Sequence, residues 1–228
     1  MGISFYTFQT LSYTLDIYRR KTEPTTDFVA FALFVAYFPQ LVAGPIERAR
    51  NLLPRLVNPR RVAWPGIAVG VELILIGFLK KVAVADVLGP LVDVRVARPE
   101  LASGADLLLC VFLFSFQIYA DFSGYSDIAR GTSRLFGIPL MRNFEQPYLS
   151  RSISEFWRRW HISLGGNRKG PRRTYANLMV TMLLGGLWHG ASWTFVIWGG
   201  LHGIYLAMDK VRLRSARVHE STVSDLLR

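Results

Sequence analysis

The sequence predicts an all-α fold, a polytopic integral membrane bundle of helices. Two features of the composition favour it: hydrophobic residues make up 51% of the 228 residues, and charged residues only 19%. The third feature is arrangement, because long apolar stretches alternate with short basic clusters. Apolar segments of about 20 residues with Lys and Arg at their ends are typical of transmembrane helices.

The N-terminal part of the chain predicts two helices of different character. Residues 2–18 are rich in aromatic and hydroxyl side chains, which suits a helix inside a bundle or one lying at the membrane interface. Residues 28–43 are apolar but short for a full crossing, and we expect Pro39 to kink them. A basic loop, 48–61, follows this segment.

Two longer apolar regions, 66–92 and 105–129, are each expected to cross the membrane once. A pair of lysines interrupts the first region. The second ends in a polar stretch, ADFSGYSDIARG, in which Asp127 and Arg130 have the spacing of an i,i+3 ion pair. We expect the two carboxylates of this stretch, Asp121 and Asp127, to form structural ion pairs.

The C-terminal part combines a short amphipathic helix with a long apolar run. Ser152 and Glu155 form a capping-box pattern for a helix through Leu164. Residues 175–208 are apolar and rich in glycine, but they are too few for two full crossings. We therefore expect a broken or re-entrant helix at 185–190, which is tolerated only where protein or water covers it.

The formal net charge of +11 raises the question of nucleic-acid binding. We exclude it because the basic residues lie at the ends of membrane-length segments and do not form one face. The excess of Lys and Arg places loops 48–61 and 130–173 inside the cell and loop 93–104 outside. The sequence predicts a division of the chain into a membrane domain over 1–210 and a polar basic tail over 211–228.

Several kinds of site are excluded by residue type. The single cysteine, Cys110, permits neither an internal disulfide nor a cysteine-based metal site. The chain has no P-loop, no G-x-S-x-G elbow and no H-E-x-x-H motif. We expect no metal and no bound cofactor.

Two histidines are the candidate site residues. His189 lies in LLGGLWHGASW, inside an apolar run, where ionisable groups are costly and usually face a cavity or pathway. Imidazole is also suited to moving a proton near neutral pH. His161 lies among tryptophans and arginines in EFWRRWHISL. The alternative for His189 is a core histidine bound to a backbone carbonyl, and the alternative for His161 is a place in an interfacial aromatic belt. His202 is expected to pack or to form a hydrogen bond, and His219 to be solvated.

Taken together, the motifs resemble the membrane-bound O-acyltransferase family, in the branch of bacterial alginate O-acetyltransferases and of the D-alanyl transfer proteins of teichoic acid synthesis. The resemblance covers almost the whole chain to about residue 210. It rests on GISFYTFQTLSYTLDIYR, FPQLVAGPIERARNLLPRL, GFLKKVAVAD, YADFSGYSDIARGTSRLFGI, NFEQPYLSRSISEFWRRWHISL, GGNRKG and LLGGLWHGASWTFVIWGGLHG.

This resemblance implies a multi-pass enzyme of the bacterial inner membrane that moves an acyl group, here acetyl, to a hydroxyl of a polysaccharide such as alginate. It implies His189 as the general base and His161 as a second polar member of the same core. The acyl donor, acetyl-CoA or another activated acyl group, is then a substrate. The implied partners are membrane lipids, the polysaccharide acceptor, and periplasmic acetyltransferase proteins or an acyl carrier.

The sequence also departs from the pattern of that family. It lacks the family's first and last helices, and a stretch of about three helical turns is missing between Leu164 and Gly165. We therefore expect a fragment that is not a competent enzyme by itself. Two alternatives stay open: an inactive truncated family member, and a proton-coupled transporter module in which intramembrane His and Asp relay protons.

Overall fold

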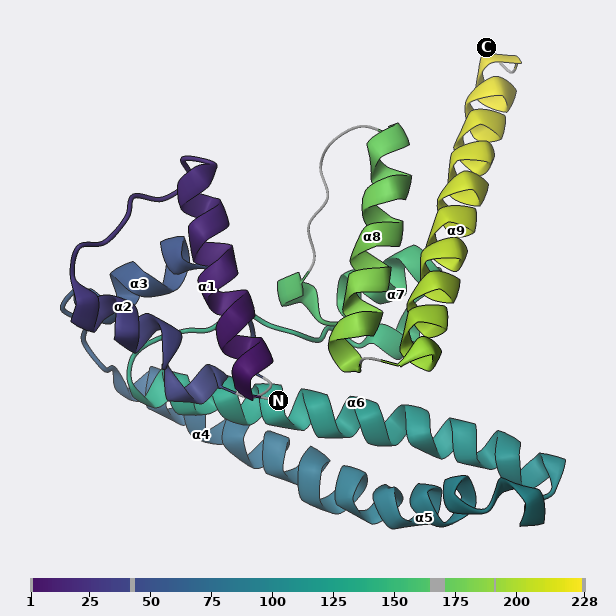
Figure 1. Cartoon of the computed structure of the whole chain (residues 1–228), viewed down its shortest axis with the longest axis horizontal. Coiled ribbons are helices and arrows are strands. Elements are labelled where there is room, and N and C mark those ends of the chain that lie inside the picture. Colours follow the sequence, from purple (N-terminus) through teal and green to yellow (C-terminus); the bar gives the residue numbers. More distant parts are fainter. Residues whose placement is uncertain (1, 42–43, 165–170, 191, 227–228) are drawn as a thin grey trace. The chain divides into compact units, whose positions relative to one another are not determined.

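The computed structural model of the chain describes residues 2–41, 44–164, 171–190 and 192–226 (Figure 1). Within these ranges every regular element is a helix, so the all-α prediction is confirmed. The chain divides into two compact units, Met1–Asn143 and Phe144–Arg228. Each unit is described by itself.

The first unit contains six α-helices and three short helices of other types among its described residues. Its elements are α1 (Gly2–Tyr18), α2 (Phe28–Val35), η1 (Phe38–Gln40), α3 (Ala49–Val57), α4 (Trp64–Phe78), η2 (Leu79–Ala85), α5 (Asp86–Ala97), η3 (Pro99–Leu101) and α6 (Gly104–Leu135). The elements of the second unit are η4 (Pro147–Leu149), α7 (Ile153–Arg159), η5 (Ile162–Leu164), α8 (Pro171–His189) and α9 (Trp193–Leu226).

A small apolar core joins α1, α2 and α3 in the first unit. In α3 the apolar residues Ala49, Leu52 and Leu56 recur at helical spacing, and all three are buried. They pack with Phe34 of α2, and Tyr13 of α1 lies with its ring centroid 6.1 Å from that of Phe34. The core fixes these short helices, which are too brief to be stable alone.

The apolar segment 28–43 is divided differently from the prediction. We expected Pro39 to kink one helix, but α2 already ends at Val35 and η1 begins at Phe38. Proline lacks a backbone N–H and its ring clashes with the carbonyl group four residues earlier, here that of Val35, so α2 ends there and Pro39 lies in a separate turn of 3₁₀-helix. Residues 42 and 43 lie outside the described ranges.

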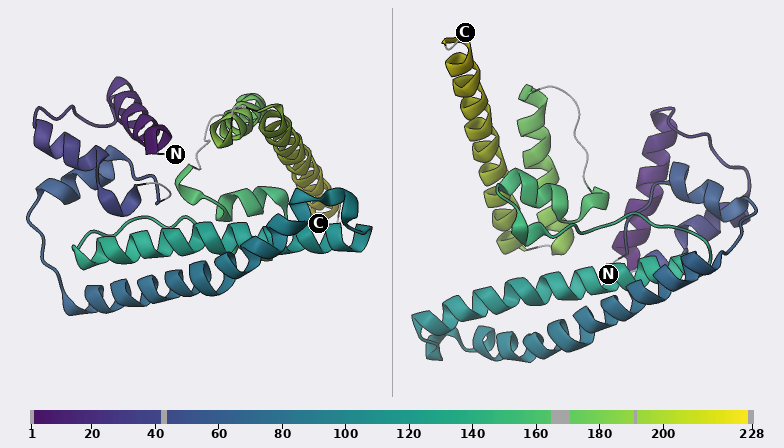
Figure 2. Two further views of the ribbon diagram at one scale, coloured as in Figure 1. Left: turned by 60° about the horizontal axis from the view of Figure 1, so that its bottom comes forward. Right: turned by 180° about the vertical axis from the view of Figure 1, so that it is seen from behind.

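A long antiparallel hairpin forms the rest of the first unit. The run α4–η2–α5 lies alongside α6 in all three ribbon views (Figures 1 and 2). The two helices approach closely through glycines: a Cβ atom on Gly77 would lie 2.6 Å from the carbonyl oxygen of Gly124. Small residues permit this close backbone approach, which is common between helices in membranes.

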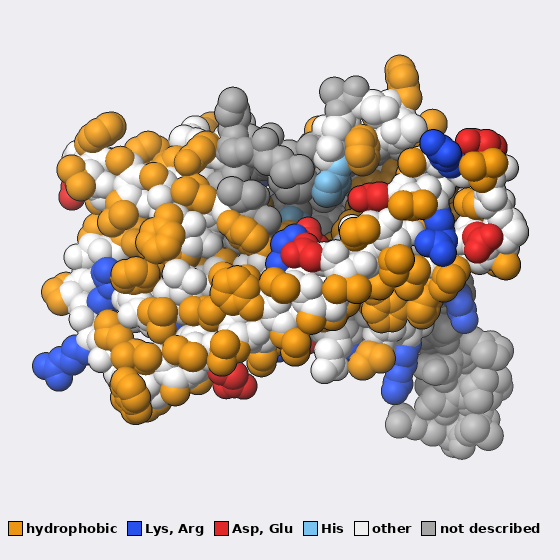
Figure 3. All heavy atoms as spheres, turned by 90° about the horizontal axis from the view of Figure 1, so that it is seen from below, with side chains coloured by type: hydrophobic (Ala, Val, Ile, Leu, Met, Phe, Trp, Pro, Cys, Tyr) orange, Lys and Arg blue, Asp and Glu red, His pale blue; other side chains and the backbone are white. Residues whose placement is uncertain are grey.

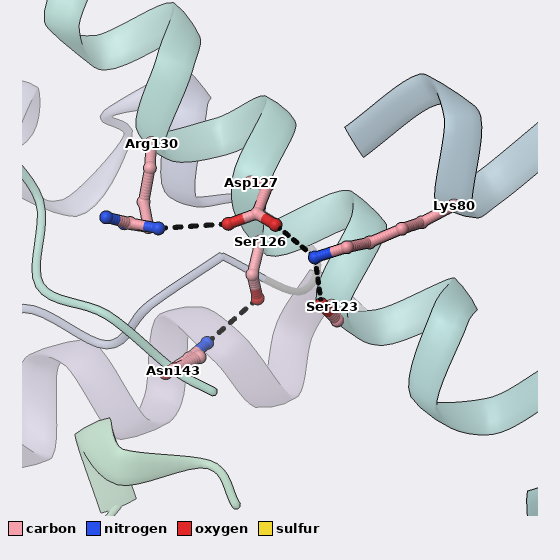
Figure 4. A network of polar contacts seen from close by, with 6 residues as sticks. All are labelled: Lys80, Ser123, Ser126, Asp127, Arg130 and Asn143. Carbon is pink, nitrogen blue, oxygen red and sulfur yellow. Dashed lines mark hydrogen bonds and ion pairs between the residues drawn. The ribbon is translucent and has the colours of Figure 1, made fainter. Parts of the chain in front are cut away.

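The lysine pair that interrupts the apolar run lies inside continuous helix, as expected for a single segment over 66–92. Residues Leu79–Ala85 continue it as a π-helix, a local widening that is often found at functional or specialised positions. The ammonium group of Lys80 lies 2.6 Å from a carboxylate oxygen of Asp127 and donates to Ser123 at 2.9 Å (Figure 4). Arg130 contacts the other oxygen of Asp127 at 2.9 Å. The predicted i,i+3 pair is confirmed, and it belongs to a network between the two arms of the hairpin.

Among the described residues, one helix is long and apolar enough to cross a bilayer by length and composition. This helix is α6, whose 32 residues contain a window of 18 residues with a mean hydropathy of 1.6. Its polar second half continues as helix to Leu135, and a capping box of Ser103 and Asp106 begins it. Shorter apolar helices cover Phe28–Gln40 and Tyr175–Leu187.

In the second unit, the helix expected through Leu164 ends earlier. Ser152 accepts a hydrogen bond from the backbone N–H of Glu155 at 3.1 Å, so the predicted start is confirmed. However, α7 stops at Arg159, whose carbonyl accepts a hydrogen bond from the N–H of Glu145 at 3.0 Å. This bond takes the acceptor that a continued helix would use, and His161 is left outside the helix.

The glycine-rich run forms a second helical hairpin, α8 and α9. The helix passes unbroken through Gly185 and Gly186 and ends at His189, so the break lies at the end of the predicted stretch 185–190. After the turn, α9 runs from Trp193 to Leu226 and continues through the boundary predicted at residue 210.

Candidate active site

Close packing of α8 against α9 determines where His189 lies. A Cβ atom on Gly186 would overlap the carbonyl oxygen of Phe195, and one on Gly199 would overlap that of Met182. The helices therefore touch backbone to backbone at the end of the hairpin where the chain turns. His189 is the last residue of α8 and lies at this turn.

His189 is surrounded by aromatic residues of α9. Its imidazole stacks on the ring of Phe195 at a centroid distance of 6.3 Å. It also meets Trp198 edge to face at 5.6 Å. The side chain is exposed. An imidazole held by aromatic rings and open on one side can be reached by a reactant.

His202 joins the same aromatic group one helical turn further along α9. Its ring lies 4.7 Å from Trp198 and 5.2 Å from Trp157 of α7, and both contacts are T-shaped. Trp157 and Trp198 are themselves 6.3 Å apart. These contacts agree with the packing role expected for His202, and they connect α7 to His189 through Trp198.

His161 takes an unusual backbone conformation just after α7. Its φ angle is +48°, in the left-handed region that non-glycine residues seldom occupy. Trp160, the residue before it, holds the turn by packing against Phe144 at 5.0 Å and Phe156 at 5.5 Å. A left-handed residue costs about 1–3 kcal/mol and is concentrated at functional sites. We regard this as support for a role of His161 beyond an aromatic belt.

The environment of His161 keeps its ring neutral. Desolvation by the surrounding atoms lowers the pKa of His161 to about 4, with a second contribution from the charge of His189. The two candidate histidines therefore lie near enough to interact electrostatically within one unit. A neutral imidazole at physiological pH can accept a proton, whereas an imidazolium cannot.

Two polar atoms near the histidines have no hydrogen-bond partner among the described residues. They are the buried indole nitrogen of Trp157 and the buried hydroxyl of Ser163, two residues after His161. An unpaired buried donor is unfavourable, and such atoms are frequently found where a ligand or water binds. The described part of the chain contains no group of three or more His, Cys, Asp or Glu able to hold a metal ion.

A sequence profile of the membrane-bound O-acyltransferase family matches residues 18–218. The chain belongs to the membrane-bound O-acyltransferase family. The matched region includes both candidate histidines and the whole aromatic group around them. Membership confirms the resemblance read from the motifs, and it makes the chain part of a membrane protein.

Three relatives illustrate the range of this family. The chain is 48% identical to a probable alginate O-acetylase of Azotobacter vinelandii, over 92% of this chain and 44% of that protein. It is 35% identical to a peptidoglycan O-acetyltransferase of Helicobacter pylori, over 100% of this chain and 50% of that protein. It is 28% identical to a teichoic acid D-alanyltransferase of Streptococcus thermophilus, over 95% of this chain and 58% of that protein. The chain thus spans less than half the length of the alginate relative.

The alginate match also contains residues of the relative that this chain lacks. It extends over 222 positions but takes in 92% of the 228 residues here, so about a dozen residues of the relative have no counterpart in this chain. The junction at which a stretch is expected to be missing, residues 165–170, lies outside the described ranges.

The sequence of this O-acyltransferase chain did not predict that two tryptophans connect its histidines. Trp157 and Trp198 together connect His202 and His189. The spacing of Trp198 and His202, four residues apart on one helix, was the available signal. The contact with Trp157 comes from another helix and has no signature in local spacing.

Proposed function

We propose that this chain carries the reaction centre of a membrane O-acyltransferase that moves an acetyl group to a hydroxyl of a polysaccharide such as alginate. The identities to alginate O-acetylases and to a peptidoglycan O-acetyltransferase support this reaction class. The observation that carries the assignment of residues is the convergence of His189, Trp198 and His202, with His161 within electrostatic range.

In this proposal His189 is the general base. Its neutral imidazole accepts the proton of the acceptor hydroxyl while the hydroxyl oxygen attacks the acyl carbonyl carbon. The tetrahedral intermediate then collapses, the bond to the donor's leaving group breaks, and the imidazolium returns its proton to that group. The acyl donor, acetyl-CoA or another activated acyl group, is a substrate, and no cofactor is required.

The proposed role of His161 is to support this base. A partly buried histidine that stays neutral near His189 adds no second positive charge to the pair, and it can orient a reactant by hydrogen bonding. The indole N–H of Trp157, which is buried and has no hydrogen-bond partner among the described residues, is a further donor available to an oxygen of the substrate.

We further propose that the chain crosses the inner membrane several times. Large apolar side chains are exposed along the hairpin of the first unit, including Leu75, Phe78, Leu108, Val111 and Phe112. Figure 3 shows hydrophobic side chains spread widely over the face in view. Exposed apolar area on this scale is not tolerated in water but suits contact with lipid tails. The run α4–η2–α5 and the helix α6 would each cross once.

The reaction class is tested with the complete gene product, purified in detergent, in two parallel assays. One measures acetyl ester formed on alginate oligosaccharide from an acetyl donor, and the other measures proton flux in liposomes. We expect ester formation that depends on the donor and no flux above that of empty liposomes. Flux without ester formation would replace this proposal by the transporter alternative.

A further inference from the structure

A carboxylate of α9 holds the start of α7. Asp209 accepts a hydrogen bond from the backbone N–H of Ser154, the second residue of α7, at 2.8 Å. The next N–H along the helix, that of Glu155, donates to Ser152. The first N–H groups of a helix have no acceptor within it, so Asp209 satisfies a donor that α7 cannot satisfy itself. A hydrogen bond to a charged acceptor is also roughly twice as strong as one between neutral groups.

Asp209 lies on the face of α9 that carries the aromatic group. It follows His202 by seven residues, and His202 follows Trp198 by four, which are the spacings of one helix face. Trp157 of α7 contacts the rings of both Trp198 and His202, at 6.3 and 5.2 Å. Helix α7 therefore packs along this face of α9, with its first turn toward Asp209 (Figure 1).

The hydrogen bond of Asp209 defines the position of α7 along α9 more sharply than the rings do. Aromatic pairs are favourable over centroid distances of about 4.5–7 Å, so they tolerate a small slide of the helix. An N–H···O hydrogen bond tolerates much less, because its usual length is only about 2.7–3.2 Å. At the other end of α7, the bond between Arg159 and Glu145 ties the helix to the preceding segment and not to α9. The bond of Asp209 thus determines where Trp157 lies, and with it His161, two residues after the end of α7.

We propose that Asp209 is a positioning residue, which holds α7 on α9 and thereby keeps Trp157 and His161 in place beside His189. It acts at a distance from the reacting groups, because 11 residues of helix separate it from Trp198, or roughly 16 Å at 1.5 Å per residue. The effect on catalysis rests on the proposed acyl transfer, whereas the anchoring of α7 does not.

The test compares Asp209→Ala with Asp209→Asn in the complete gene product, purified in detergent. Alanine removes the acceptor, whereas the side-chain carbonyl oxygen of asparagine can still accept from the N–H of Ser154. Hydrogen–deuterium exchange of the amides in 153–160 measures whether α7 is held. In Asp209→Ala these amides should exchange at least about tenfold faster, the size of one lost charge-assisted bond.

Ester formation on alginate oligosaccharide with acetyl-CoA as donor measures the consequence for the reaction. Misplaced groups slow the conversion of bound substrate, so Asp209→Ala should lower kcat by about 10- to 100-fold and change KM for acetyl-CoA by less than about threefold. Asp209→Asn should restore most of kcat and most of the protection from exchange, which loss of the charge alone would not allow.

Asp106→Ala is the matched control. Asp106 also accepts a backbone N–H at the start of a helix, that of Ser103 at 3.1 Å, but it does so in the first unit. This control should leave the exchange of 153–160 and kcat unchanged, and melting temperatures verify that all three variants fold.

Three results would overturn the proposal: unchanged exchange in Asp209→Ala, faster exchange with an unchanged kcat, or an Asp209→Asn protein as slow as Asp209→Ala. An unmodified protein that forms no ester refutes the proposed function instead. The exchange measurement alone then decides whether Asp209 holds α7.

Discussion

Replacing one of two adjacent glycines in α9 tests the packing that holds the histidine group together. A Cβ atom on Gly199 would overlap the carbonyl oxygen of Met182 and lie 3.2 Å from the Cα atom of Leu183. Backbone atoms cannot rotate away, so Gly199→Ala must push α8 and α9 apart. At Gly200 the nearest atom is a side-chain carbon of Leu183 at 3.8 Å, an ordinary contact.

The two substitutions should therefore change stability in opposite directions. Alanine is favoured over glycine inside a helix by about 1 kcal/mol, and both variants gain that amount. Overpacking costs about 1–3 kcal/mol, and we expect the upper value for Gly199→Ala because backbone is involved. Gly199→Ala should then lose about 2 kcal/mol, whereas Gly200→Ala gains about 1 kcal/mol.

Thermal unfolding of the detergent-solubilised protein measures the difference. A gap of about 3 kcal/mol corresponds to roughly 10 °C between the two melting temperatures for a chain of this size. Gly185→Ala and Gly186→Ala form a second pair on α8, since a Cβ atom on Gly185 meets nothing within 4 Å. Equal melting temperatures for Gly199→Ala and Gly200→Ala would refute close packing of α8 on α9.

Three further predictions concern other parts of the chain. The pKa of His161 is lowered to about 4, so the unfolded chain takes up a proton at this residue before the folded chain does as the pH falls from 6.5 to 4. The free energy of unfolding should therefore fall by about 3 kcal/mol over that pH range. His161→Asn should remove this loss, which thermal melts at several pH values in the range would measure. Lys80→Met should destabilise by about 2 kcal/mol, and a double-mutant cycle with Asp127→Asn should give a coupling energy above about 0.5 kcal/mol; no coupling would contradict the ion pair. In a background without the native cysteine, Arg61→Cys should react with a membrane-impermeant thiol reagent only from the cytoplasmic side and Ala102→Cys only from the periplasmic side; the reverse would overturn the predicted orientation.

Features that depend on local sequence were predicted well. The α-helical class, the start of α7 at Ser152 and the Asp127–Arg130 pair follow from composition, capping and i,i+3 spacing, which neighbouring residues determine. The membership in the membrane-bound O-acyltransferase family followed from motifs spread over the chain.

Features that depend on contacts between distant residues were not predictable in the same way. The prediction of a helix through Leu164 was wrong because the backbone N–H of Glu145 donates a hydrogen bond to the carbonyl of Arg159, 14 residues away in the sequence. The lysine pair was read only as an interruption of the apolar run, because its partner, Asp127, lies on another helix and the π-helix at Leu79–Ala85 has no signature in local spacing. For the same reason, Trp157 could not be assigned to the histidine group from spacing.

The most direct test of the account is the acetyl-transfer activity of the complete gene product carrying His189→Ala. The rate of ester formation on alginate oligosaccharide is normalised to the amount of inserted protein, with His202→Ala as the matched control from the same aromatic group. A positioned general base contributes about 10²–10⁴-fold, so His189→Ala should lose at least about 100-fold, while His202→Ala should keep most of the activity. A His189→Ala protein that is inserted normally and acetylates as fast as the His202→Ala protein would contradict the central claim.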